Sequence, residues 1–405
     1  MRAIVPLLVL LAYCLSAFAE EPVGEANAPD APIVTPVARP SLNLEQIEAR
    51  IDRLMQREEM VGLGVAIVEG GEITLAKGFG ETVHGSGNAV TESTVFRWAS
   101  LSKGAAGTLA GLLAAEGKLA LDRPVSDYRT SLRLPNGGHT RATLTHVLSH
   151  QLGIVPNAYD TRLEDGRDPA GIRRALGALK ATCGVGACHT YQNVAFDTIS
   201  EVVTRQTGDH FETALETRLF EPLGMRTASA SRDALLASDH AMPHRRIRRT
   251  RTPRLVGVKA PYFRVPAAGG INSSVLDLAL YMRAQMGLRS DVLPTPVIDT
   301  IHAPAVRTLR EQRYMNRRYG GRMKNAQYGL GWRTYTYEGG HAVVGHRGAV
   351  EGYRATILFD PALDTGIAVV WNSFASNPVG LQFEVMDMVY GLEAEDWMRL
   401  DNDVS

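Results

Sequence analysis

Cysteine, aromatic residues and net charge are all scarce in this sequence. Only 3 of its 405 residues are cysteine and 7% are aromatic, and its 43 Lys and Arg residues balance its 43 Asp and Glu residues. A balanced charge lacks the basic field that attracts nucleic acid. Without zinc-ligand spacing or clustered aromatic residues, the sequence offers no structural metal site and no platform for stacking bases. We therefore expect no nucleic-acid partner, no metal and no cofactor.

Long apolar runs are also scarce, and the one exception opens the chain. An almost continuous apolar run covers residues 3–18, and the Ala17–Ala19 segment has the small-x-small form that signal peptidase accepts. This pattern predicts a signal peptide over residues 1–19. A retained membrane anchor is the alternative, but the run is short for a bilayer span of about 20 residues. We expect an exported protein, periplasmic or secreted, with no stable membrane span after cleavage.

Two cysteines, Cys183 and Cys188, lie beyond that segment. An exported protein enters an oxidising compartment, where an even number of cysteines favours a disulfide bond. Gly184 and Gly186 lie between them and ease a tight loop. We therefore predict a Cys183–Cys188 disulfide, with two reduced and unrelated thiols as the alternative.

The order of helix and strand patterns predicts that both ends of the chain build one sheet. Residues 20–42 are rich in Pro, Ala and acidic residues and predict a flexible linker. A helical pattern begins at Leu44, and two β-favouring runs follow on either side of a hairpin turn at Glu69–Glu72. After a mainly helical middle, short strand patterns return at residues 332–337, 342–345, 353–359 and 366–371, and a final amphipathic helix fits residues 379–390.

This order predicts an α+β fold, an antiparallel β-sheet flanked by helices with an inserted, mainly helical lobe. The folded domain covers residues 43–398. The sheet lobe takes about 43–99 and 266–398, and the helical lobe takes about 100–265. We expect a ligand-binding cleft between the two lobes.

Ser100 and Lys103 form the first candidate catalytic pair. A serine hydroxyl is a poor nucleophile until a base removes its proton. If Ser100 opens a helix, Lys103 lies one turn further along the same face, so its amine can reach the hydroxyl. The helix N-terminus favours developing negative charge, and burial favours the neutral amine that a base requires. Taken alone, the pair fits a helix N-cap followed by a solvated lysine better.

Tyr191 and Asn193 form the second candidate group. A tyrosine phenol near a lysine can pass a proton to a leaving group, and an asparagine beside it can hold the lysine and bind a substrate amide. A half-buried loop tyrosine is the alternative. Tyr314 and Asn316 repeat the same spacing, but they lie in an arginine-rich segment, residues 310–318, that we interpret as a solvated loop.

His346 and Gly348 form the third candidate group, at the end of an apolar strand pattern. A cation on an edge strand that faces the serine could bind a substrate carboxylate, and Gly348 would let the substrate backbone approach closely. Histidine is only partly charged near neutral pH. Arg347 points away from the cleft if His346 faces it. A strand-end histidine with structural hydrogen bonds is the alternative.

A basic stretch covers residues 245–254, with six arginines: Arg245, Arg246, Arg248, Arg249, Arg251 and Arg254. Such a stretch can attract anionic cell-envelope polymers or carboxylated substrates. We favour the simpler interpretation, a solvated loop.

Taken in order, Ser-x-x-Lys, Tyr-x-Asn and a cation-x-Gly strand resemble the serine β-lactamase and penicillin-binding-protein superfamily. The resemblance is greatest to class C β-lactamases and their relatives, which include DD-peptidases, D-aminopeptidases and family VIII carboxylesterases. The segments Leu144–His150, Ala267–Ser274 and Tyr328–Trp332 also resemble this family. The similarity runs from about residue 45 to 398. The His-x-Gly form of the third motif resembles D-aminopeptidases, whereas typical class C enzymes have Lys-Thr-Gly there.

The resemblance implies a role for each candidate residue. Ser100 attacks a carbonyl and forms an acyl-enzyme, and Lys103 and Tyr191 manage the proton. Asn193 orients Lys103 and the substrate. The backbone N–H groups of Ser100 and Ala349 form an oxyanion hole, and the strand residues His346 and Gly348 bind substrate.

These inferences predict a periplasmic serine hydrolase that works through an acyl-enzyme on a small-molecule or peptidoglycan-like substrate. Hydrolysis of the β-lactam amide is the first expectation. The alternatives with the same machinery are a carboxylesterase and a D-aminopeptidase or DD-peptidase. The alternative of another class is a non-catalytic protein that binds peptidoglycan or a β-lactam.

Overall fold

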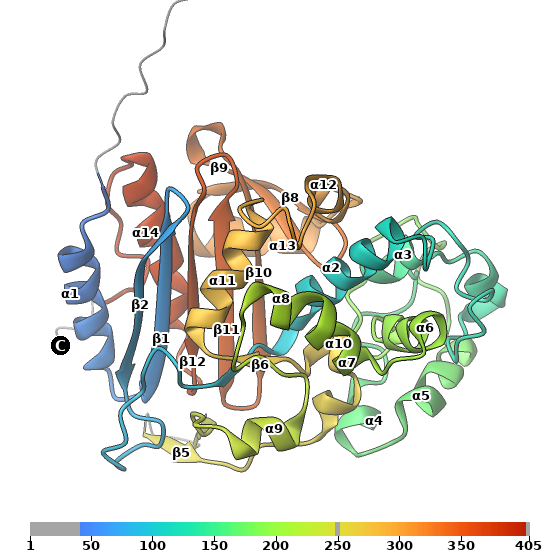
Figure 1. The fold of residues 1–405 in the computed structure, drawn as a ribbon, viewed down its shortest axis with the longest axis horizontal. Coiled ribbons are helices and arrows are strands. Elements are labelled where there is room, and N and C mark those ends of the chain that lie inside the picture. Colours follow the sequence, from blue (N-terminus) through green and yellow to red (C-terminus); the bar gives the residue numbers. More distant parts are fainter. Residues whose placement is uncertain (1–40, 248–251, 402–405) are drawn as a thin grey trace, which may run out of the picture. The chain divides into compact units, whose positions relative to one another are not determined.

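The computed structural model describes residues 41–247 and 252–401 (Figure 1). The predicted signal peptide, almost all of the predicted linker and three arginines of the basic stretch, Arg248, Arg249 and Arg251, lie outside the described residues. Within them, no helix is long and apolar enough to cross a bilayer.

An eight-stranded antiparallel sheet forms the centre of the fold. Strands from both ends of the chain meet in it, because β1 pairs with β12, with Val65 opposite Val369. The strand order is β2 (Glu72–Gly80), β1 (Gly62–Glu69), β12 (Thr365–Trp371), β11 (Tyr353–Asp360), β10 (Ala342–Val350), β9 (Arg333–Tyr337), β8 (Met323–Tyr328) and β7 (Val306–Arg307).

Alternation of side chains along the strands gives the sheet two buried faces. On β1, Val65 and Ile67 pack with Ile51 of helix α1 (Leu44–Met55) and Val385 of helix α14 (Leu381–Tyr390). Ala66, which lies between Val65 and Ile67, belongs instead to the large core formed with the other helices. Figure 1 shows the resulting layers, with α1 and α14 on one face and α11 (Val275–Gln285) on the other.

Most of the helices lie between β3 (Phe96–Arg97) and β6 (Asn272–Ser273), which pair with each other. They extend away from the sheet, toward the right of Figure 1. In chain order they are α2 (Ser102–Ala115), α3 (Leu144–Leu148), α4 (Asp160–Glu164), α5 (Pro169–Ala175), α6 (Thr198–Thr207), α7 (Phe211–Leu215), α8 (Glu221–Leu223), α9 (Arg232–Ala237) and α10 (Pro266–Gly269), followed after β6 by α11, α12 (Thr295–His302) and α13 (Leu309–Arg318). The predicted α+β fold class is thereby confirmed.

The interpretation of residues 310–318 as a solvated loop is wrong, because helix α13 covers them. Met315 is its one fully buried residue, and Tyr319 is buried just beyond the helix, one turn further on. Both pack on Tyr335 of β9 and Phe383 of α14. So narrow an apolar stripe among arginines is hard to recognise in a sequence. The sequence analysis also did not predict strands β7 and β8.

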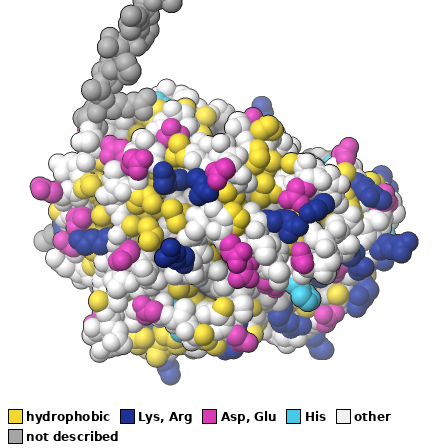
Figure 2. Space-filling view, viewed as in Figure 1, with side chains coloured by type: hydrophobic (Ala, Val, Ile, Leu, Met, Phe, Trp, Pro, Cys, Tyr) yellow, Lys and Arg dark blue, Asp and Glu magenta, His cyan; other side chains and the backbone are white. Residues whose placement is uncertain are grey.

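The two described parts of the basic stretch form a small antiparallel ladder, β4 (His244–Arg246) with β5 (Pro253–Leu255). Arg245 lies 3.7 Å from the carboxylate of Glu351. Across the face drawn in Figure 2, cationic and anionic side chains are interspersed, as expected for a chain without net charge.

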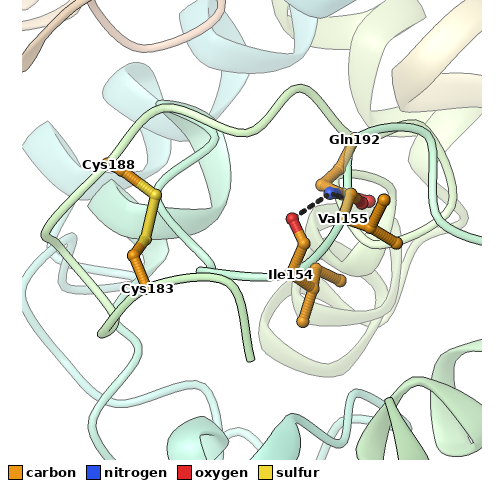
Figure 3. The surroundings of a disulfide bond; sticks show 5 residues. All are labelled: Ile154, Val155, Cys183, Cys188 and Gln192. Carbon is orange, nitrogen blue, oxygen red and sulfur yellow. Dashed lines mark hydrogen bonds between the residues drawn. A yellow bond between two sulfur atoms is a disulfide. The ribbon is translucent and has the colours of Figure 1, made fainter. Parts of the chain in front are cut away.

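The predicted disulfide is present and joins Cys183 to Cys188. Its loop is tied to the segment before α4, since the N–H of Thr182 donates to the carbonyl of Gly153 at 2.8 Å. Figure 3 shows the neighbouring tie, in which the amide of Gln192 donates to backbone carbonyls at Ile154 and Val155, at 3.5 and 2.8 Å. These hydrogen bonds tie the disulfide loop and Gln192 to the segment before α4.

Candidate active site

Ser100 lies in a short 3-10 turn, η1 (Ala99–Leu101), which runs directly into helix α2. The residue before it, Ala99, has a positive φ of 50°. Such a conformation costs a non-glycine residue on the order of 1–3 kcal/mol and persists only where its surroundings enforce it. Trp98 supplies that constraint, because its backbone N–H donates to Ile271 and its indole N–H donates to the hydroxyl of Ser273. The turn therefore presents a partly exposed Ser100 on a rigid support.

Gly348 brings strand β10 against this turn. A Cβ atom at Gly348 would lie 2.0 Å from the carbonyl oxygen of Trp98 and 3.0 Å from the backbone nitrogen of Ser100. A side chain is excluded there, so the strand backbone can run close to the Ser100 N–H. Pairing of β9 with β10 stops at Gly345, which leaves the next residues of β10 without a β9 partner on that edge. Ala349, in this part of the strand, is exposed.

Lys103 is fully buried and points at Ser100. Its Nζ lies 3.3 Å from Ser100 Oγ, 2.7 Å from Asn193 Oδ1 and 2.8 Å from the carbonyl oxygen of Ala268. The amide and carbonyl oxygens can only accept hydrogen bonds. Lys103 therefore donates to both of them, and these two bonds hold its Nζ beside the Ser100 hydroxyl.

Asp160, which the sequence analysis missed, fixes the orientation of Asn193. The Nδ2 of Asn193 donates to Asp160 Oδ2 at 2.6 Å, so its Oδ1 must face Lys103. Burial raises the pKa of Asp160, and the Asn193 hydrogen bond and the Lys103 charge oppose that rise. Tyr159 adopts a left-handed conformation (φ 62°) at the N-terminus of α4, immediately before this carboxylate. The result is a chain of contacts from Asp160 through Asn193 and Lys103 to Ser100.

We expect Asp160→Ala to lower kcat by on the order of a hundredfold, because a small misplacement of a reacting group has effects of that size. KM should change little, since Asp160 acts through Asn193 and Lys103. Asp160→Asn, whose amide oxygen can still accept from Asn193, should restore most of the rate. Steady-state kinetics with an aryl ester tests this, with Asp165→Ala on the exposed end of α4 as control. An equal loss in both Asp160 variants would contradict the orienting role.

Tyr191 lies over the lysine. Its ring centre is 4.8 Å from Lys103 Nζ, and it packs on the imidazole of His150 with ring centres 4.3 Å apart. The alternative motif lies elsewhere, on α13. There Tyr314 packs on the guanidinium of Arg347, and Asn316 accepts a hydrogen bond from Gln312. The structure thus brings Tyr191 and Asn193, and not Tyr314 and Asn316, to the Ser100–Lys103 pair.

His346 is the residue whose environment differs most from the expected one. The sequence predicted a partly charged histidine, but the side chain is buried and its pKa lies well below the usual range, chiefly because of burial and then because of the nearby Arg333 and Lys103 charges. His346 Nδ1 lies 2.8 Å from the carbonyl of Arg347, so Nδ1 carries the proton. The Nε2 atom accepts from the Tyr328 hydroxyl at 2.9 Å. His346 is therefore neutral in this site.

The hydrogen bonds continue from Tyr328 to His150 on the other side of the site. The N–H of Gln192 donates to His150 Nδ1 at 3.1 Å, so the His150 proton is on Nε2, which donates to Tyr328 Oη at 3.2 Å. Burial lowers the pKa of His150 well below its usual range and raises that of Tyr328. All three rings are therefore neutral, and one directional hydrogen-bond chain links the Tyr191–Asn193 loop to strand β10. The sequence analysis noted Tyr328 and His150 only within family-like segments and did not predict this link.

Tyr328→Phe should lower the free energy of unfolding by about 2–4 kcal/mol, because it leaves two buried imidazole nitrogens without partners. Urea denaturation followed by circular dichroism measures this. Tyr314→Phe is the matched control, since the Tyr314 hydroxyl has no hydrogen bond to any described residue, and it should change stability by less than about 0.5 kcal/mol. Equal stabilities of the two variants would argue against the chain.

Comparison with known proteins agrees with this fold. The β-lactamase family model matches residues 47–382. Esterase EstB of Burkholderia gladioli is 28% identical over 197 residues, which cover 45% of this chain and 50% of the esterase. A β-lactamase of Pseudomonas fluorescens is 26% identical over 180 residues, which cover 44% of this chain and 49% of that enzyme. The chain thus matches about half the length of these two relatives.

Among solved structures, the octameric penicillin-binding protein homologue from Pyrococcus abyssi superposes with a TM-score of 0.77 at 24% identity, covering 87% of this chain and 78% of that one. This similarity shows a shared fold. The family model matches most of the chain, and this match shows the family as well as the fold. The chain belongs to the β-lactamase family.

Proposed function

We propose that this protein is an exported hydrolase that cleaves small esters and amides through an acyl-enzyme on Ser100. The observation that carries the proposal is the set of three contacts at Lys103 Nζ, which hold the amine beside the Ser100 hydroxyl. Lys103 takes the hydroxyl proton as Ser100 attacks the carbonyl. Tyr191, whose ring covers the lysine, passes a proton to the leaving group.

The developing oxyanion has a natural place between Ser100 and β10. We assign its stabilisation to the backbone N–H groups of Ser100 and Ala349, and the close approach of Gly348 to the Ser100 nitrogen supports this. Loss of one such donor typically costs about 2.7–4 kcal/mol of transition-state stabilisation. A water molecule then attacks the acyl-enzyme. Tyr191 takes the proton of the water, and Lys103 returns a proton to the Ser100 oxygen as the acid is released.

The neutral His346 favours simple esters and amides as substrates. A permanent cation at that strand position would attract the carboxylate of a β-lactam, and a buried imidazole with a lowered pKa does not supply one. β-Lactam hydrolysis is the second candidate, favoured by the match to the β-lactamase of Pseudomonas fluorescens. A D-aminopeptidase activity is the third, and it uses the same contacts at Lys103.

Three chromogenic substrates separate these candidates: a p-nitrophenyl alkanoate, a cephalosporin and D-alanine p-nitroanilide. We expect the ester to turn over fastest, with a mass increase on Ser100 equal to the acyl group in rapidly quenched samples. Faster turnover of the cephalosporin or of the anilide would reassign the substrate class. A protein that turns over none of them, and gains no mass on Ser100, would be the non-catalytic binding protein.

We also propose that the enzyme works in the periplasm or outside the cell. The predicted signal peptide and the Cys183–Cys188 disulfide support this location, since disulfides persist in oxidising compartments. Fractionation of the native host, with detection of an N-terminus after Ala19, tests it.

A further inference from the structure

Large apolar side chains with high exposure are few in the part of the chain that the structure describes, and three of them share one edge of the molecule. Leu236 belongs to α9, Ile247 directly follows β4 and Leu255 belongs to β5, and they are 40%, 40% and 47% exposed. Only Val155 and Leu309 are comparably exposed elsewhere in residues 41–247 and 252–401. Single exposed apolar residues are ordinary on a protein surface, whereas a group of them marks a contact site.

Helix α9 and the β4–β5 ladder adjoin, as Figure 1 shows along the lower edge of the view. Arg232 of α9 donates to the carbonyl of Val258, just beyond β5, at 3.2 Å. Leu236 lies four residues after Arg232, one turn further along the same face of the helix. We call the surface formed by α9 and by residues 244–247 and 252–259 the α9–hairpin edge.

Cationic side chains accompany the apolar ones on this edge. There are five of them: Arg232, Arg245, Arg246, Arg254 and Lys259. The acidic side chains on the edge or in contact with it include Asp233, Glu58 and Glu351. Glu351 lies 2.6 Å from Lys259 and 3.7 Å from Arg245, so this one carboxylate is shared by two cations. Arg254 forms no hydrogen bond or ion pair with any residue in the described ranges, and its guanidinium is therefore available to an outside anion.

The register of the ladder places two of these arginines opposite each other. Arg245 pairs with Arg254, and residues directly opposite point to the same face. His244 and Pro253, which alternate with them, are buried, so Arg245 and Arg254 face outward. Like charges directly opposite destabilise a ladder, and strands of three residues gain little from their own pairing. An anionic surface that faced both arginines would replace this repulsion with attraction.

The combination of cations and apolar groups indicates which anionic partner fits. A solvated loop, the expectation from sequence, accounts for the exposed arginines and leaves the exposed apolar side chains unexplained. A soluble polyanion would bind the arginines but would leave the apolar side chains in water. A bilayer with anionic lipids offers phosphate headgroups at its surface and hydrocarbon just beneath them, so it accommodates both kinds of side chain.

We propose that the α9–hairpin edge docks this protein on an anionic lipid bilayer. Arg245 and Arg254 lie at the level of the headgroups, where guanidinium groups bind phosphate oxygens in pairs. The three exposed apolar side chains enter the interface beneath them. The proposal does not depend on acyl transfer at Ser100.

The edge is fastened to the sheet near the candidate active site. A Cβ atom at Gly352 would lie 2.6 Å from the backbone nitrogen of His244, so the ladder packs on the turn between β10 and β11. Ala349, which flanks Ser100, lies three residues before Gly352, at most about 10 Å along an extended chain. Docking therefore holds the Ser100 site close to the bilayer surface.

Co-sedimentation with lipid vesicles tests the proposal. We expect the wild-type protein to partition at least about tenfold more strongly onto phosphatidylcholine vesicles with about 30% phosphatidylglycerol than onto pure phosphatidylcholine, and about 0.5 M NaCl should remove most of this difference. Arg245→Gln/Arg254→Gln should weaken binding to the anionic vesicles about tenfold, and Ile247→Ser/Leu255→Ser should weaken it by a similar factor. All proteins carry the same N-terminus, so any binding by residues 1–19 is common to them.

Arg310→Gln/Arg313→Gln is the matched control. It removes two exposed arginines from α13, close in sequence to the exposed Leu309, and so tests another place where cations accompany an apolar side chain. This variant should bind anionic vesicles as the wild-type protein does. Loss of binding here, with binding retained in the two hairpin variants, would overturn the proposal.

Three further results would also overturn it. The first is equal partition of the wild-type protein onto both kinds of vesicle. The second is unchanged vesicle binding in both hairpin variants, with native circular dichroism. The third is loss of binding in the arginine variant alone, together with equally tight binding of the wild-type protein to soluble polyphosphate, which would make the edge a polyanion site. Turnover of a soluble p-nitrophenyl ester should be the same in all of these proteins, so the docking surface and acyl transfer at Ser100 are tested separately.

Discussion

Ser100→Ala is expected to abolish formation of the acyl-enzyme and to reduce kcat/KM for an aryl ester by about 10⁵-fold or more. In the proposed mechanism the Ser100 hydroxyl oxygen forms the covalent bond to the acyl group, so neither Lys103 nor Tyr191 can replace it. Intact-protein mass spectrometry after rapid quenching reads the acylation directly, and release of the phenol reads the rate. A variant that still gains the acyl mass would remove Ser100 from the mechanism.

Ser102 provides the matched control two residues away. It is fully buried, and its hydroxyl accepts the N–H of Ile271 at 3.1 Å. Ser102→Ala should therefore lower the free energy of unfolding by about 1 kcal/mol and still form the acyl-enzyme. The two variants together separate loss of a nucleophile from loss of a hydroxyl near the start of α2.

Lys103→Met has the second largest expected effect, a fall in kcat of about 10³-fold. Methionine fills a similar volume but can neither take the Ser100 proton nor donate to Asn193 Oδ1 and the Ala268 carbonyl. Pre-steady-state kinetics should place the loss in acylation, because the hydroxyl then attacks without its base. Retention of the wild-type acylation rate would mean that another group accepts the proton.

The stability of Lys103→Met tests the same contacts in another way. The substitution removes a buried amine but leaves two buried oxygens unpaired, and these effects partly offset each other. We expect a net change within about 2 kcal/mol, too small to unfold the protein. Lys118→Met is the control for loss of a lysine, since Lys118 is exposed and contacts Glu116 near the end of the same helix. It should leave the rates unchanged.

The fold could be predicted from sequence where the hydrophobic pattern was strong. Helix α1 and the β1–β2 hairpin appear where the apolar periods predicted them, because one face of each element is buried. Helix α13 was missed for the opposite reason: Met315 is its only fully buried residue, and its arginines resemble those of a solvated loop. Periodicity thus predicts elements that bury a wide face and fails for those that bury little.

The candidate site was predictable in its first contacts and not beyond them. Ser100, Lys103 and Asn193 belong to short motifs, and the structure brings them within hydrogen-bonding distance. Asp160 lies in no motif, and its role depends on the orientation of an amide in space. The neutrality of His346 was equally inaccessible, because it follows from burial and from a tautomer fixed by the backbone carbonyl of Arg347. The charge state of a side chain, and the residues that orient a catalytic group, depend on the three-dimensional surroundings, which motif spacing does not reveal.

The pairing of β1 with β12 also constrains how this polypeptide acquires its shape. Leu63 lies opposite Trp371, so a nascent chain must extend through β12 before β1 gains this neighbour. Contacts this distant in sequence form slowly, whereas short local helices such as α6 can form during synthesis. The strand that flanks Ser100, β10, is likewise made late. A chain that ends before β10 therefore carries Ser100 and Lys103 without the strand that packs against them, so we expect it to gain reactivity only after β10 has been synthesised.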